Sequence, residues 1–89
     1  MGHARPRPQR LASKLFQIRL SVGLSQRELI KRMGIEEQIH YPNISKYELG
    51  KNEPPLKILL AYARLVNIPV EMLIDDELDL PPEIRPHRI

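Results

Sequence analysis

The chain has 89 residues and a formal net charge of +3, and 42% of its residues are hydrophobic and 28% charged, which suits one globular domain with a modest core. It contains no cysteine, so disulfides and thiolate metal sites are excluded, and no stretch approaches the ~20 consecutive apolar residues of a membrane span. The basic N-terminus is followed by no apolar run and is therefore not a secretory signal, so we expect a cytoplasmic protein.

The positive charge is concentrated at the N-terminus. Residues 1–10 contain Arg5, Arg7 and Arg10 and no acidic residue, whereas residues 75–89 contain five acidic residues and two arginines. Because prolines alternate with other residues here and no helical periodicity is present, we expect residues 1–8 to form a flexible basic arm. A polyanion is expected to meet this end of the chain.

Two helices are predicted in the first third of the chain. The first carries apolar residues at three- and four-residue steps, namely Leu11, Leu15, Ile18 and Val22. This spacing indicates an amphipathic helix over residues 9–22, which Gly23 ends. The second begins at a capping box, in which the Ser25 hydroxyl caps the backbone and Glu28 reaches back. It spans residues 26–33 and is closed by Gly34.

The third predicted helix is short and is preceded by an ambiguous stretch. Residues 35–41, "IEEQIHY", carry either an extra turn or a loop. The helix begins near His40–Pro42, because proline fits a first turn but not a helix interior, and it ends before Gly50. Ile44 and Tyr47 can face the core, which leaves mainly polar side chains on the other side. A helix of about eight residues is marginal in water and must be held by its neighbours.

The last third of the chain contains a fourth and a fifth helix and a tail. Residues 56–67, "LKILLAYARLVN", carry one broad apolar stripe, and residues 70–76, "VEMLIDD", form a short final helix. Residues 76–89 are an acidic, proline-containing tail, which is either disordered or binds a partner through Leu78, Leu80 and Ile84. We therefore predict an all-α fold, with five helices in one domain over residues 9–75.

Two short capped helices, the second with a polar exposed face, fit a helix-turn-helix that lays its second helix in a DNA major groove. The stretches "IRLSVGLSQRELIKRMG" and "NISKYELGKNEPPLKILLAYARLVNIPVEMLI" resemble the Cro and lambda-repressor-like (xenobiotic-response-element type) helix-turn-helix domain. The resemblance covers residues 11–74 and implies a compact lambda-repressor-like fold. Its specific parts are "GLSQ" before "EL", the "ISKYELGK" of the third helix, and "EPPL" before the fourth.

The resemblance also implies a set of site residues. The candidates for base readout lie at exposed positions of the third helix, namely Tyr41, Asn43 and Lys46. The candidates for binding the DNA backbone are Ser25, Gln26, Lys51 and Asn52. Arg19 and Glu48 occupy positions that commonly form a partly buried ion pair between the first and third helices.

The chain departs from the family pattern in two places. The stretch between Gly34 and Glu48 is several residues longer than usual, with the surplus in residues 35–39, and either Ile35 or Ile39 could enter the core. Pro42 stands where many members carry a polar residue that reads bases. It has no donor and can only position the helix or make an apolar contact, for example with a thymine methyl group.

The resemblance implies a small bacterial, phage or plasmid transcriptional regulator that binds specific double-stranded DNA, a repressor that acts as a homodimer on an inverted repeat. One alternative is an antitoxin whose acidic tail neutralises a toxin. Another is an interaction module that has kept the fold without binding DNA. The basic arm either solubilises the chain or lies along the DNA.

No enzyme is predicted, because no carboxylate pair, nucleophile set or phosphate loop is present. We expect no cofactor and no metal site, since His3, His40 and His87 are far apart in the sequence and no cysteine is available.

Overall fold

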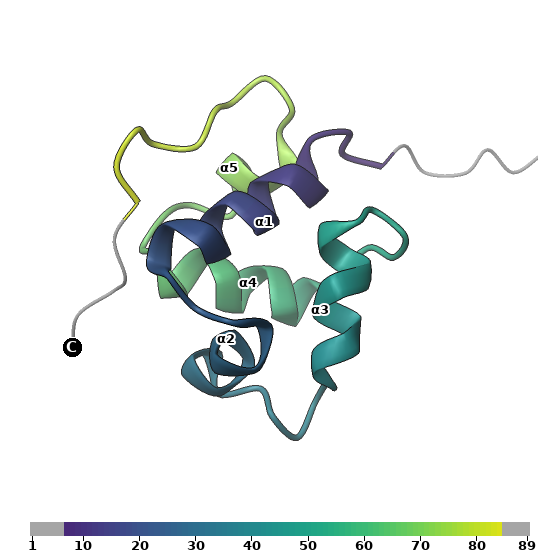
Figure 1. Cartoon of the computed structure of the whole chain (residues 1–89). Coiled ribbons are helices and arrows are strands. Elements are labelled where there is room, and N and C mark those ends of the chain that lie inside the picture. Colours follow the sequence, from purple (N-terminus) through teal and green to yellow (C-terminus); the bar gives the residue numbers. More distant parts are fainter. Residues whose placement is uncertain (1–6, 85–89) are drawn as a thin grey trace, which may run out of the picture.

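Five helices make up the described part of the chain, which in this computed structural model is residues 7–84. They are α1 (Leu11–Val22), α2 (Gln26–Met33), α3 (Tyr41–Glu48), α4 (Leu56–Leu65) and α5 (Glu71–Ile74). Figure 1 shows α4 crossing behind the other helices, α3 standing at one side, and α1 and α5 together above α4. The predicted all-α fold is confirmed over these residues, among which no strand occurs. Residues 1–6 of the predicted arm, with Arg5, and residues 85–89 of the tail lie outside the described residues.

The ends of α2 follow from local sequence. The Ser25 hydroxyl accepts a hydrogen bond from the Glu28 amide at 3.1 Å, and the Glu28 carboxylate accepts one from the Ser25 amide at 2.9 Å. The hydrogen bond from the Ser25 backbone amide, and after it the nearby Ser25 hydroxyl, lower the pKa of the Glu28 carboxyl. Gly34 closes the helix with a φ of 71°, a left-handed conformation that glycine adopts without a steric penalty. The predicted capping box and bounds of α2 are thus confirmed.

The core is aliphatic apart from two tyrosines, Tyr47 and Tyr62. Its fully buried side chains come from all five helices and include Leu15, Ile18, Leu29, Ile44, Ile58, Tyr62 and Leu73. Both isoleucines of the long turn enter this core, since Ile35 is 4% exposed and Ile39 is 8% exposed. The Ile39 amide donates to the Ile35 carbonyl at 3.2 Å, so the surplus residues form an extra hydrogen-bonded turn between two core positions.

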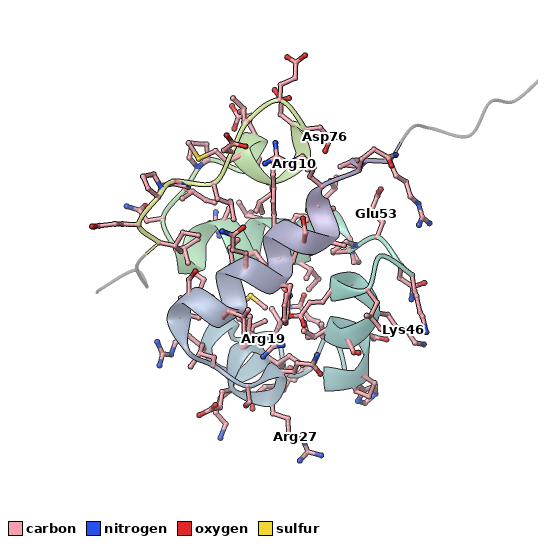
Figure 2. All side chains as sticks on the ribbon, turned by 45° about the horizontal axis from the view of Figure 1, so that its top comes forward. Arg10, Arg19, Arg27, Lys46, Glu53 and Asp76 are labelled. Atoms are coloured by element: carbon pink, nitrogen blue, oxygen red, sulfur yellow. The ribbon has the colours of Figure 1, made fainter. Side chains whose placement is uncertain are left out.

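The segment after α5 is fastened to the start of α1. The Asp76 carboxylate accepts hydrogen bonds from the backbone amides of Gln9 and Arg10, at 2.8 and 3.0 Å. The Arg10 guanidinium donates in return to the Asp76 carbonyl at 2.7 Å and binds the Asp79 carboxylate. Figure 2 shows Arg10 and Asp76 side by side where these two segments meet. The helix α1 begins at Leu11, two residues later than the periodicity predicts, and its N-cap residue Arg10 is one of the two residues whose amides bind Asp76.

Lys14 binds the same segment from inside the domain. Its side chain is only 2% exposed, and its ammonium donates to the carbonyls of Met72, Asp75 and Leu78 at 2.7, 2.9 and 2.7 Å. Burial lowers the pKa of this ammonium, and the neighbouring charge of Arg10 acts in the same direction. An ammonium has three donors, so all of them are used here. We call Gln9, Arg10 and Lys14, with residues 72–79, the terminal clasp.

Acid is expected to loosen the terminal clasp. Hydrogen bonds from the amides of Gln9 and then Arg10 lower the pKa of the Asp76 carboxyl. A carboxylate with a lowered native pKa contributes stability above its unfolded pKa of about 3.9, and this contribution is lost as pH falls through the native pKa. Asp76→Asn should therefore reduce stability at neutral pH and flatten its decline in acid. Denaturant unfolding at a series of pH values tests this, with Glu77→Gln as a control that removes one exposed carboxylate from the same segment.

Candidate DNA-binding surface

The helix α3 is held at the edge of the domain by one buried face. Ile44 is fully buried and Tyr47 nearly so, and α3 packs against both α1 and α2. On the remaining sides, Pro42 and Lys46 are exposed, and Asn43 and Ser45 are half-buried. Lys46 projects from α3 away from the rest of the domain (Figure 2). The short helix therefore offers a polar outer face and is pinned by its neighbours.

Both ends of α3 are set by special residues. His40 is the N-cap residue without a side-chain cap bond, and Pro42 lies in the first turn, where a missing amide donor costs nothing. Tyr41 is the first residue of the helix, and its side chain lies outside the described part of the structure. After the helix, Gly50 has a φ of 76° and turns the chain. Lys51 and Asn52 follow as exposed residues, and the Lys51 amide donates to the Lys46 carbonyl at 2.9 Å.

A partly buried polar cluster joins α1, α2 and α3. The Arg19 guanidinium donates to both Glu48 carboxylate oxygens, at 2.7 and 3.0 Å, and to the Leu24 carbonyl at 3.0 Å. The Gln26 amide donates to the same Glu48 carboxylate at 3.2 Å. The two charged side chains are 15% and 5% exposed, and the hydrogen bond with Glu48 raises the pKa of Arg19. This cluster fixes Glu48, the last residue of α3, to the first two helices.

The predicted backbone-binding residues fall into two places. Ser25 and Gln26 open α2, where Ser25 is exposed and Gln26 is half-buried against Glu48. Lys51 and Asn52 lie in the loop that follows α3. The structure thus puts these two pairs at the start and at the end of the helix-turn-helix unit.

Arg7 adds a cation that the family resemblance did not single out. A cleft of about 190 Å³ separates residues 7–9 from the loop after α3, and Arg7, Gln9, Gly50 and Asn52 are among its lining residues. The described end of the basic arm therefore borders the loop that carries Lys51. The signal for this was present in the sequence as an arginine-rich N-terminus, but its position beside the loop depends on the fold.

An α2–turn–α3 unit with an anchored, polar-faced second helix defines the class of helix-turn-helix proteins. Comparison with protein families matches residues 15–73, more than half of the chain, to the helix-turn-helix family. The chain belongs to this family, in its Cro and lambda-repressor-like type, and is a DNA-binding regulator. The family is one of DNA-binding domains and not of enzymes.

No curated protein and no solved structure gave a match to the chain. Among residues 7–84, no helix has the length and apolar character needed to cross a membrane.

Proposed function

We propose that this protein binds specific double-stranded DNA as a homodimeric repressor, with α3 in the major groove of each half of an inverted repeat. The observation that carries the proposal is the anchoring of α3. Ile44, Tyr47 and Glu48 bind the domain and leave the outer face free for a ligand. A rigid short helix of this kind fits the major groove, and a single module of this size reads too few base pairs to act alone.

The proposed roles follow from chemistry and exposure. Asn43 and Lys46 hydrogen-bond base edges, since an amide suits adenine and an ammonium suits guanine. Tyr41 joins them at the start of the helix, and exposed Pro42 makes apolar contact with a base. The residues that bind phosphates and fix the register are Ser25, Gln26, Lys51 and Asn52. Arg19 and Glu48 support the reading helix without touching DNA.

Selection from a random duplex pool at near-physiological salt tests the proposal. Sequencing after several rounds should reveal an enriched inverted repeat with half-sites about one helical turn apart. Sedimentation of the protein with the enriched duplex should give two chains per duplex. Weak, strongly salt-dependent binding without enrichment would instead support the interaction-module alternative.

Replacing Lys46 by alanine is expected to weaken binding to the enriched duplex by about 1–3 kcal/mol and to relax selectivity at one base pair. Lys51→Ala is the matched control, because loss of a phosphate contact should weaken binding to every duplex alike and reduce the salt slope by about 0.9. Titrations of both variants against the enriched and a scrambled duplex at several salt concentrations measure this. An equal loss on both duplexes for Lys46→Ala would remove Lys46 from base readout.

The antitoxin alternative gains no support from the acidic segment. Asp76 and Asp79 bind Arg10 of the same chain, so these carboxylates are already used within the domain. Isolation of a small basic protein bound to the chain in the native host would nevertheless favour this alternative.

A further inference from the structure

Besides the cleft beside Arg7, the molecule has a groove at the other end of α2 from Ser25 and Gln26. It has a volume of about 480 Å³ and runs between the C-terminal end of α2, the turn that follows it, and α4. Its apolar lining residues are Met33, Ile35, Leu60, Ala61 and Leu65. Ile35 and Leu65 belong to the buried core and form its floor, whereas Leu60 is 39% exposed. The apolar surface that the groove exposes therefore comes mainly from Leu60 and from the half-buried Met33 and Ala61.

The charged residues of this groove are all cations. Arg32 from α2 and Lys57 and Arg64 from α4 line it, and all three are exposed. None of their side chains makes a hydrogen bond or an ion pair with any of residues 7–84, and no aspartate or glutamate lines the groove. Three cations around an apolar floor complement a ligand that presents carboxylates beside apolar side chains.

The acidic segment of this chain is engaged elsewhere. Asp76 and Asp79 bind Arg10 at the start of α1, and Lys14 binds the carbonyls of the same segment. A second copy of the chain would have its acidic segment fastened in the same way. The acidic segment of a second copy would therefore not supply the complementary carboxylates.

Duplex DNA would use only part of this groove. Phosphates would bind the cations, but they would gain nothing from Met33, Ala61 or the exposed side chain of Leu60. The exposed Leu56 lies one helical turn before Leu60 on α4 and extends the apolar edge. A ligand with its own apolar side chains would bury this surface and bind the cations at the same time.

We propose that the groove between α2 and α4 binds an acidic amphipathic segment of a partner protein. Its apolar side chains, at helical spacing, lie over Met33, Leu60 and Ala61, and its carboxylates pair with Arg32, Lys57 and Arg64. Because Arg32 lies at the end of α2 opposite Ser25 and Gln26, a partner can bind here while those two residues face DNA. The inference concerns a surface outside the proposed DNA contacts and stands whether or not a specific operator exists.

A designed peptide tests the inference on the full chain. The probe is a fluorescent amphipathic helix with leucines at three- and four-residue spacing and glutamates on its other positions. Two control probes are a lysine-for-glutamate version and a version with the same composition in scrambled order. Fluorescence anisotropy measures binding of each probe, and NMR chemical-shift perturbation locates it. We expect only the first probe to shift the amides of Met33, Leu60 and Leu65.

Charge reversal in the groove distinguishes binding of the probe at this groove from nonspecific attraction between an acidic peptide and a basic protein. The double substitution Arg32→Glu with Arg64→Glu should weaken the acidic probe at least about tenfold. The control with the same charge change, Lys31→Glu with Lys51→Glu, should weaken it far less, since neither lysine lines the groove. Thermal melting of both variants verifies folding. Failure of the acidic probe to bind, equal binding of the scrambled probe, or equal losses in both variants would overturn the inference.

Discussion

Replacing Glu48 by alanine is expected to destabilise the domain by roughly 3–5 kcal/mol, because one partner of a partly buried ion pair is removed. The Arg19 guanidinium would lose both carboxylate contacts, and the Gln26 amide would lose its acceptor on α3. For a domain of this size, the melting temperature falls by about 4–8 °C per kcal/mol. Since the total stability of such domains is about 5–15 kcal/mol, a large part of the stability would be lost. Thermal and denaturant unfolding measure the effect.

Two further variants separate loss of the ion pair from loss of packing. Glu48→Gln keeps the shape and one acceptor oxygen, so it should destabilise less than Glu48→Ala. The double variant Arg19→Met with Glu48→Leu removes both charges and should recover much of the stability, since a well-packed apolar pair avoids the desolvation cost. An unchanged melting temperature for Glu48→Ala would contradict a structural role. DNA selectivity measured below the melting temperature should be retained, because the Glu48 side chain is 5% exposed and points from α3 towards Arg19 on α1.

The parts of the fold that the sequence predicts well are those fixed by local chemistry. The capping box at Ser25 and the left-handed Gly34 define α2 from both sides, and the bounds of the helix agree with the prediction. Pro42 and Gly50 bracket α3 in the same way. At these positions the backbone conformation depends on residues no more than a few places away, so neither tertiary contacts nor a ligand are needed to infer it.

The conformation of the long turn between α2 and α3 could not be predicted from local sequence. Ile35 and Ile39 are four residues apart, which is compatible with either of them entering the core. The structure buries both, because one extra turn brings them to the same side. This depends on the space left between α2, α3 and α4, and periodicity within the stretch carries no information about that space. The groove beside this turn was missed for the same reason, since Arg32 and Arg64 are brought together only by packing of α2 against α4.

The terminal clasp was not predicted, although the sequence contains a signal for it. Lys14 lies three residues after Leu11 and four before Ile18, so it falls on the apolar face of α1. A lysine at such a position needs buried acceptors. Its acceptors are carbonyls more than fifty residues away in the sequence, at the end of α5 and beyond. Only the tertiary structure identifies them.

Replacing Lys14 by methionine is expected to destabilise the domain by about 2–3 kcal/mol. Methionine keeps most of the side-chain volume and removes the cost of burying an ammonium. It leaves the carbonyls of Met72, Asp75 and Leu78 without their donor, and these bonds are charge-assisted and therefore stronger than neutral ones. Lys31→Met is the matched control, because Lys31 is exposed on α2 and its loss should change stability by less than about 0.5 kcal/mol. Denaturant unfolding compares the two.

Hydrogen exchange distinguishes local opening of the clasp from general destabilisation in Lys14→Met. The amides of Gln9 and Arg10 are protected by Asp76, which lies within the segment that Lys14 holds. If the segment detaches, these two amides should exchange much faster, while core amides such as that of Ile18 should speed up only in proportion to the loss of global stability. Unchanged protection at Gln9 and Arg10 would mean that Asp76 and Arg10 hold the segment without Lys14. Faster exchange would make Lys14 the residue that couples the start of α1 to the C-terminal segment.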